Sequence, residues 1–95
     1  MASFVLMCID KPDSLALRMA TRERHLAYVK SHAHLLRGGG PLLGEDDGMN
    51  GSLILIEAED IAVARAFNAE DPYTLAGLFE RVDIRPYRAT LSATP

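Results

Sequence analysis

Two segments of this chain are apolar on both faces of the strands that they would form. In Phe4–Ile9 and again in Leu53–Ile56 every residue is apolar, although successive side chains of a strand point to opposite faces. An antiparallel sheet with one face in water alternates apolar and polar residues instead. Both faces of a sheet built from these segments therefore need a cover.

Two further segments have the residues of helices. Leu15–Ala33 lacks Gly and Pro and follows the candidate N-cap residues Asp13-Ser14. Glu59–Ala69 is expected to form a second helix, because its first two residues are acidic and acidic side chains favour a helix start. This helix ends at Asp71-Pro72, since a proline disfavours the α conformation of the residue before it.

The segment between the two helices predicts a strand hairpin. Leu36–Leu43 contains three consecutive glycines followed by Pro41, which indicates a broken strand with a bulge. Asp46–Gly51 has the polar residues of a turn, and Asn50-Gly51 within it suits a tight hairpin. The strand Ser52–Glu57 then follows this turn.

The C-terminal part of the chain adds one more strand. Leu75–Phe79 predicts a short turn or helical stub, and Val82–Arg88 mixes apolar and charged residues as edge strands do. The order β-α-β-β-α-β is that of a ferredoxin-like α+β domain, an antiparallel sheet with two helices on one face. Because these helices cover one face only, we expect a second copy of the chain to cover the other by sheet-on-sheet packing, as a homodimer.

Composition and charge narrow the class of protein. Hydrophobic residues make up 48% of the 95 residues, enough for a single domain over residues 1–95. The formal net charge is −3 and no run of Lys or Arg occurs, so nucleic acid is not an expected partner. The apolar runs are too short to cross a membrane. With no basic signal-peptide region and one cysteine, Cys8, expected to be buried, we expect a cytoplasmic protein.

The long helix contains a conflict between its apolar residues and its charges. Arg22 falls inside a predicted apolar stripe, and Arg18, His25 and His32 line one border of it. A buried guanidinium is unfavourable unless it is paired. Arg22 therefore either snorkels or pairs structurally, or it reaches with Arg18 into a polar pocket beside His25. The stripe consists of Leu15, Met19, Leu26, Val29 and Ala33.

His25 and Asp71 are the candidate proton-transfer pair. A histidine titrates near neutral pH, and a nearby carboxylate makes it a general base. Asp71 is the best carboxylate candidate because Pro72 stiffens the backbone beside it. The alternatives are an ordinary histidine at the stripe border and an aspartate that only stops the helix or forms an Asx turn. A His–Asp pair near arginines suits proton transfer on a small organic anion.

Other common sites lack their motifs. His25, His32 and His34 do not share one helix face at i, i+4 spacing, and there is no Cys-x-x-Cys, so no metal site is expected. The triple glycine lacks the Lys-Ser or Lys-Thr of a P-loop, and no Gly-x-Ser-x-Gly elbow occurs. We expect no cofactor.

Several short motifs occur in a fixed order from about Phe4 to Arg88. They are Arg18-Met-Ala-Thr-Arg22-Glu-Arg-His25-Leu26, Gly40-Pro41, Gly51-Ser52, Asp71-Pro72-Tyr73 with Ala76-Gly77-Leu78, and Ile84-Arg85-Pro86-Tyr87. Together they resemble the YCII-related (YciI-like) family. The one departure is the run of three glycines, where the family has a single Gly before Pro.

The resemblance implies a fold, a site and a class of activity. The fold would be ferredoxin-like and would dimerise through its sheets into a dimeric α+β barrel, as in muconolactone isomerase. The site would be a cleft with a histidine and an aspartate as its polar pair, which map onto His25 and Asp71. Relatives include enzymes of chloroaromatic breakdown. The motif positions that would line the same cleft are Arg22, Ser52, Pro72 and Tyr73.

Two hypotheses for the function follow. In the first, the chain is a small enzyme that performs isomerisation, elimination or lactone chemistry by general acid–base catalysis. His25 would move a proton, Asp71 would orient it, and Arg22 or Arg18 would hold a substrate carboxylate or enolate. Ser52 and Tyr73 would add hydrogen bonds. In the second, the same cleft of a dimeric module binds a small metabolite or a partner protein without reacting.

Overall fold

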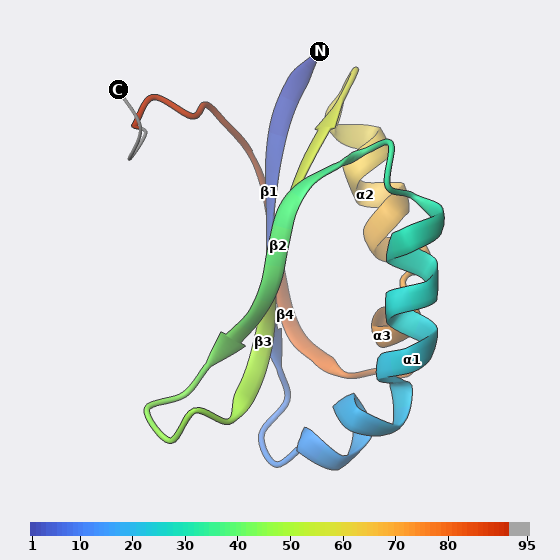
Figure 1. The fold of residues 1–95 in the computed structure, drawn as a ribbon, viewed down its shortest axis with the longest axis vertical. Coiled ribbons are helices and arrows are strands. Elements are labelled where there is room, and N and C mark those ends of the chain that lie inside the picture. The colour runs from blue at the N-terminus through green and yellow to red at the C-terminus, as the bar shows by residue number, and fades with distance from the viewer. Residues whose placement is uncertain (92–95) are drawn as a thin grey trace.

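The chain folds into one antiparallel sheet with its helices on one side (Figure 1). The structure is a computed structural model that describes residues 1–91. The strand order is β2-β3-β1-β4, which places β1 and β3 in the centre. This is the ferredoxin-like α+β fold that the sequence predicts. The elements are β1 (Ala2–Asp10), α1 (Leu15–Ser31), β2 (Leu36–Leu43), β3 (Met49–Ala58), α2 (Ile61–Glu70), α3 (Pro72–Leu75) and β4 (Phe79–Tyr87).

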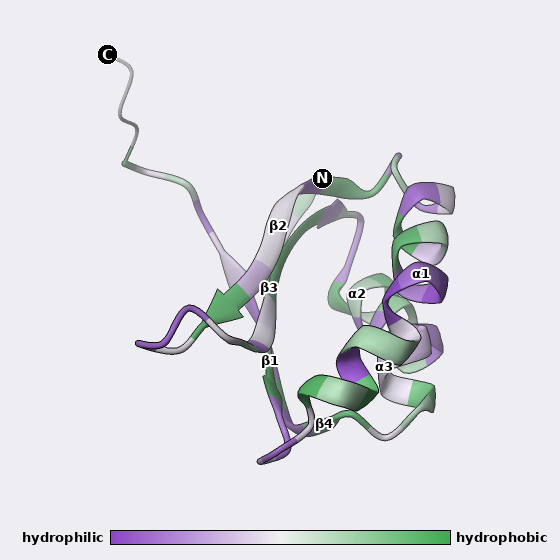
Figure 2. Ribbon diagram, turned by 60° about the horizontal axis from the view of Figure 1, so that its bottom comes forward, coloured by the Kyte–Doolittle hydropathy of each residue, from purple (hydrophilic) through white to green (hydrophobic). Residues whose placement is uncertain are grey.

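The central strands are apolar on both faces, as the sequence predicts. Residues of β1 and β3 that face the helices are fully buried, among them Leu6 and Ile56. On the opposite face, Val5 pairs with Leu55 and Met7 pairs with Leu53, and 42% of the Met7 surface is exposed in the single chain. Figure 2 shows no helix over this face. The edge position of β4 is also confirmed.

Helix α2 packs on the sheet through its small and aromatic residues. Ala64 and Phe67 are buried against the core. The Asp60 carboxylate caps the helix by accepting hydrogen bonds from the backbone N–H groups of Ala62 and Val63. The Tyr28 hydroxyl donates to the Phe67 carbonyl at 2.8 Å and so links α1 to α2.

No helix within residues 1–91 is long and apolar enough to span a membrane.

The hairpin turn overlaps the start of the predicted turn segment Asp46–Gly51, but Asn50-Gly51 does not form it. Both residues lie in β3, and the turn is at residues 44–48. Asp47 adopts a left-handed φ of 65° there, and the Asp46 carboxylate accepts a hydrogen bond from the Gly48 N–H. Gly51 is needed for a different reason: a Cβ atom at this position would lie 2.5 Å from the Cys8 carbonyl oxygen on the neighbouring strand.

The glycine-rich strand β2 is irregular, as predicted. Its register against β3 shifts between Leu36 and Gly38 and again between Leu42 and Leu43. A Cβ atom on Gly39 would lie 2.6 Å from the Leu53 carbonyl oxygen, and Gly39 has a φ of 155°. A side chain at this position would clash with the adjacent strand, so β2 lies against β3 through bare backbone.

The segment after α2 differs from the prediction in position. The helical stub is α3 at Pro72–Leu75, not Leu75–Phe79, and β4 begins at Phe79 instead of Val82. The reason is that Asp71 caps α3 and Pro72 occupies its first turn. Gly77, with a φ of 74°, then turns the chain toward β4.

The orientation of α1 is the largest departure from the prediction. The helix buries Arg18, Thr21 and His25, which are polar, while Leu15, Met19 and Leu26 of the predicted stripe are 45–50% exposed. Figure 2 shows hydrophilic and hydrophobic residues intermixed along this helix. Polar residues tolerate this burial because each finds a partner, as Thr21 Oγ1 does by donating to the Leu17 carbonyl at 2.8 Å.

Candidate active site

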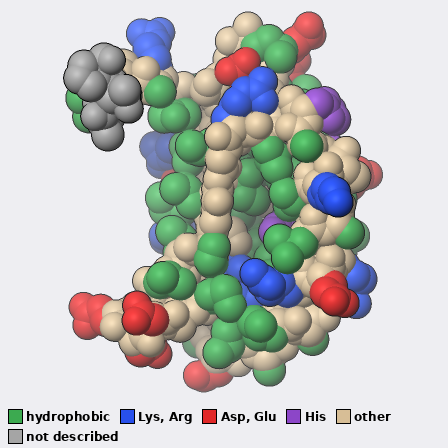
Figure 3. All heavy atoms as spheres, viewed as in Figure 1, with side chains coloured by type: hydrophobic (Ala, Val, Ile, Leu, Met, Phe, Trp, Pro, Cys, Tyr) green, Lys and Arg blue, Asp and Glu red, His purple; other side chains and the backbone are tan. Residues whose placement is uncertain are grey.

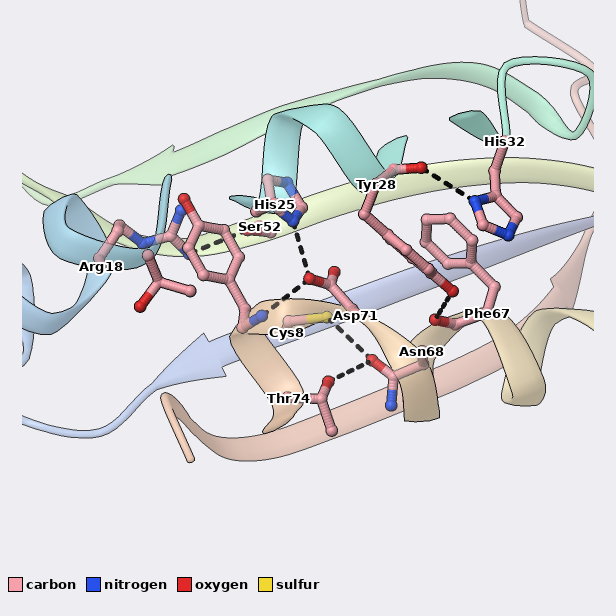
Figure 4. Close-up of polar contacts among 12 residues, drawn as sticks. Cys8, Arg18, His25, Tyr28, His32, Ser52, Phe67, Asn68, Asp71 and Thr74 are labelled. Carbon is pink, nitrogen blue, oxygen red and sulfur yellow. Dashed lines mark hydrogen bonds and ion pairs between the residues drawn. The ribbon is translucent and has the colours of Figure 1, made fainter. Parts of the chain in front are cut away.

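A histidine from α1 and an aspartate from the α2–α3 junction meet between the helices and the sheet. His25 Nδ1 lies 2.9 Å from Asp71 Oδ1, although 46 residues separate them in the chain. Both residues are buried. Figure 4 shows the two side chains pointing toward one another. The structure therefore brings together the two residues that the sequence proposes as a pair.

The Asp71 carboxylate is held in place by the backbone as well as by His25. It follows the last residue of α2 and caps α3, where its Oδ1 also accepts a hydrogen bond from the Tyr73 N–H at 2.9 Å. A carboxylate can only accept, so His25 Nδ1 carries the hydrogen that is shared with Asp71. In the neutral ring this assigns the free lone pair to Nε2, and His25 lines the adjoining cavity.

Tyr73 forms the wall against which the histidine and an arginine pack. Its ring stacks on the His25 imidazole, with 4.0 Å between centroids and an angle of 17°. The Arg18 guanidinium carbon lies 4.6 Å from the same ring centroid, a cation–π distance. Burial raises the pKa of the Tyr73 hydroxyl above its ordinary value, and the nearby arginines oppose this only in part.

Arg18 is neutralised by a carboxylate that the sequence analysis did not identify. Its Nε and Nη2 atoms donate to the two oxygens of Asp10 at 2.7 and 2.9 Å. Nη2 also donates to Ser52 Oγ at 2.9 Å. Burial alone would lower the pKa of Arg18, but the hydrogen bond and charge of Asp10 outweigh burial and raise that pKa. The guanidinium is thus a fixed part of the wall.

Asp10 was missed because it ends a strand just before a turn, where aspartate commonly serves the backbone. One signal was available: Asp10 follows the apolar run Phe4–Ile9 with the same two-residue spacing as Leu6 and Cys8. Such spacing places it on the helix-facing side of β1. A carboxylate on a buried face requires a cation, and Arg18 lies in the first turn of the neighbouring helix.

Arg22 lies at the rim of the site and is exposed. Within residues 1–91 it makes no ion pair, in contrast to Arg18. It is therefore the cation that the site can offer to an anion. Both arginines line the cavity beside His25, but the donors of Arg18 already serve Asp10 and Ser52.

These side chains surround a cavity of about 90 Å³. Its polar wall consists of Arg18, Arg22, His25, Ser52 and Tyr73. Pro72, which the sequence also places in the cleft, does not line this cavity; it lies beside Arg24 and Leu75 at the start of α3. The apolar wall, which the motifs only partly indicate, consists of Leu26, Gly40, Pro41, Met49 and Ile54.

The lone cysteine lies close to the pair but is not part of it. Cys8 is buried on β1, and its Sγ lies 3.9 Å from Asn68 Oδ1. Burial, followed by the negative charge of Asp71, raises the pKa of the thiol to about 12. A thiol with this pKa is a poor nucleophile near neutral pH.

Within residues 1–91, no three His, Cys, Asp or Glu side chains are grouped as metal ligands.

Comparisons with known proteins identify the family. Residues 2–88 match the model of the YCII-related domain. Protein YciI of Escherichia coli is 33% identical over 93 residues, which cover 90% of this chain and 95% of that protein. Its function is not stated by its name.

Among the solved structures that resemble this chain, one is a relative of similar sequence identity with a named enzymatic activity. TftG of Burkholderia phenoliruptrix, a 5-chloro-2-hydroxyhydroquinone dehydrochlorinase solved in complex with 2,5-dihydroxybenzoquinone, is 33% identical with a TM-score of 0.84, over 90% of this chain and 93% of that chain. SnoaB, a cofactor-independent oxygenase from Streptomyces nogalater, shares the fold alone, with a TM-score of 0.57 and 14% identity over 99% of this chain and 97% of that chain. On the family match and these identities, the chain belongs to the YCII-related family.

Proposed function

We propose that this chain is an enzyme that transfers protons on a small organic anion by general acid–base catalysis, with His25 as the proton carrier. The observation that carries the proposal is the His25–Asp71 contact of 2.9 Å at the wall of a cavity. Because Nδ1 is bound to Asp71, Nε2 serves as the base. When Nε2 takes a proton, the imidazolium is stabilised by the adjacent carboxylate.

The charges around the cavity support an anionic substrate. Asp10 neutralises Arg18, and Asp71 faces His25, so Arg22 remains as the unpaired cation. Arg22 would hold the negative charge of a carboxylate or of the enolate that forms when a proton leaves. Ser52 and Tyr73 supply hydroxyl groups at the same wall.

Among the possible reactions, elimination has the most direct support. TftG, a relative at 33% identity over 90% of this chain, is a dehydrochlorinase. In such a reaction Nε2 accepts a substrate proton, the electron pair left behind forms a new π bond, and the leaving group departs with its bonding pair. The net change is loss of HX from the substrate, which balances without an oxidant or a reductant.

The test uses the substrate of that relative. Purified protein is mixed with 5-chloro-2-hydroxyhydroquinone, and chloride release and quinone absorbance are followed. We expect turnover, and we expect His25→Ala to lower kcat by about 10²- to 10⁴-fold, the usual contribution of a general base. His34→Ala is the matched control, because His34 is exposed and outside the cavity. Equal rates for His25→Ala and the unmodified protein would contradict the proposal.

A binding assay separates this proposal from the non-catalytic alternative. The affinity of the same variants for 2,5-dihydroxybenzoquinone is measured by calorimetry. Tight binding with no chloride release from 5-chloro-2-hydroxyhydroquinone, or from other halogenated hydroxyquinols, would favour a binding module instead.

We also infer that a second copy covers the open sheet face. Val5, Met7, Leu53 and Leu55 form an apolar centre there, across β1 and β3, and an exposed apolar patch of this kind marks an interface. The polar edge on β4, where Arg85 pairs with Asp83 at 3.0 Å, would form the rim. The single buried thiol supports a reducing compartment, which we infer to be the cytoplasm.

A further inference from the structure

Helix α1 exposes a line of apolar residues beside the cavity. Leu15, Met19 and Leu26 are 45–50% exposed, and their spacing places them with Arg22 on one flank of the helix. The buried face of α1 lies next to this flank and carries Arg18 and His25. The helix therefore buries three polar residues, Arg18, Thr21 and His25, and exposes this apolar flank beside the site.

The opposite wall of this entrance is also apolar. Leu26 of α1 faces Pro41 of β2 and Met49 and Ile54 of β3 around the cavity. Figure 3, in the orientation of Figure 1, shows a hollow between β2 and α1 in which hydrophobic side chains surround basic ones. Gly40 leaves the β2 side open, since a Cβ atom there would meet nothing within 4 Å.

A larger hollow lies near the small cavity and shares one lining residue with it. Met49 lines both the cavity of about 90 Å³ at His25 and a second hollow of about 450 Å³ between the β1–α1 loop and the β2–β3 hairpin. Leu15 lines the second hollow. The apolar flank of α1 thus leads from Leu26, past Arg22 and Met19, to the wall of the larger space.

We propose that this apolar flank is a specificity subsite, and that the natural ligand is an anion with an extended apolar body. Its charged, reactive end would lie on Arg22 in the inner cavity, and its body would lie along Met19, Leu26 and Met49. The inner cavity of about 90 Å³ is smaller than the cavity of about 150 Å³ that holds benzene in a known case, so a ring-sized ligand would extend beyond it toward the flank. The inference rests on the proposed site, not on its catalysis.

The expected signature is a dependence of affinity on apolar length. In the series benzoate, 4-methyl-, 4-ethyl- and 4-propylbenzoate, each added methylene buries apolar surface and raises the affinity up to about fourfold. Met19→Gln should flatten this dependence while leaving benzoate binding nearly unchanged, and Leu26→Gln, at the wall of the inner cavity, should flatten it while also weakening benzoate. Arg22→Gln should weaken every member about tenfold or more with the dependence intact. Leu75→Gln, at a site 73% exposed on α3, is the matched control.

Methionine methyl NMR locates the ligand. The chain has four methionines, of which Met49 lines both hollows and Met7 lies on the open face of the sheet. Binding of 4-propylbenzoate should shift the methyl signals of Met19 and Met49 and leave that of Met7 in place. His25→Ala, even with turnover abolished, should keep the same length dependence, so that a failure of catalysis and a failure of this subsite are distinguished.

Three results would overturn the proposal. The first is a length dependence in Met19→Gln and Leu26→Gln equal to that of the unmodified protein. The second is a ligand shift at Met7 in place of Met19 and Met49. The third is a fall in molar mass by light scattering in the α1 variants but not in Leu75→Gln, which would assign the flank to a contact between copies of the chain.

Discussion

The His25 imidazole stacks on the Tyr73 ring with 4.0 Å between centroids and 17° between planes. The stack fixes the ring plane, while the hydrogen bond of 2.9 Å to Asp71 fixes its rotation. Two independent contacts therefore determine the direction of Nε2. Pre-organisation of this kind lowers the reorganisation that a proton transfer requires.

Tyr73→Phe should preserve the stack and lower stability by less than about 1 kcal/mol, because the hydroxyl makes a smaller contribution than the ring. Tyr73→Leu should lower the free energy of unfolding by about 2–4 kcal/mol, since it removes a fully buried ring, and it should also lower kcat. Urea unfolding and the chloride-release assay measure the two effects. If Tyr73→Leu matched Tyr73→Phe in rate, the stack would have no role in aligning His25.

For the buried Asp10–Arg18 pair, removing one charged partner should lower stability much more than replacing both partners with apolar residues. Asp10→Asn leaves the guanidinium buried without its counter-charge and should lower the free energy of unfolding by about 3–5 kcal/mol. The double variant Asp10→Leu with Arg18→Met replaces the pair by apolar side chains and should recover much of that loss. Chemical denaturation of both proteins checks this, with Asp83→Asn at the exposed β4 pair as the control. A double variant no more stable than Asp10→Asn would contradict the expectation.

Burial of Cys8 makes stability depend on pH in the alkaline range. The pKa of the thiol is raised from its ordinary value of 9.0 to about 12 in the folded chain. Between these values the unfolded chain has lost the proton and the folded chain has kept it, so the contribution is complete below pH 9 and is lost as the pH rises toward 12. Between pH 9 and pH 12 the free energy of unfolding of the unmodified protein should therefore fall relative to that of Cys8→Ala. A difference that does not vary with pH would contradict the burial of the thiol.

The open sheet face predicts an oligomer that a single charge disrupts. Leu53→Asp or Met7→Asp places a carboxylate in the apolar centre of that face, and we expect light scattering to change from a dimer to a monomer. Leu75→Asp, on exposed α3, should leave the mass unchanged. If light scattering finds that the unmodified protein is a monomer, the proposed dimer through the open sheet face is contradicted.

Two glycines should differ sharply in their tolerance of a methyl group. Gly51→Ala places Cβ 2.5 Å from the Cys8 carbonyl oxygen and should cost about 1–3 kcal/mol of stability, because both strands must shift. Gly40→Ala meets nothing within 4 Å and should be within about 1 kcal/mol of the unmodified protein. Thermal unfolding of the two variants side by side is the measurement, and equal midpoints would contradict the close approach of β3 to β1.

The sequence predicts the fold well and the site in part. Strands that are apolar on both faces and the two helix patterns define the sheet and its order, because these signals depend on local residues. The hairpin turn was misplaced since strand pairing outweighs the turn preference of Asn50-Gly51. The orientation of α1 was missed because a periodic apolar stripe is assumed to face the core, whereas here Asp10 and Asp71, distant in sequence, supply the partners that bury Arg18 and His25. These contacts form only in the folded chain, so no local sequence pattern predicts them.

Asp71 ends α2 with its backbone N–H, and its carboxylate both caps α3 and holds His25. Formation of α3 and alignment of the His25 ring therefore depend on the same carboxylate. In molecules in which α3 has opened, His25 would lose its contact with Asp71, so under the proposed function local unfolding at this junction would inactivate the chain. Hydrogen exchange at the Tyr73 amide, whose N–H donates to Asp71, reports directly on the fraction of chains that are competent.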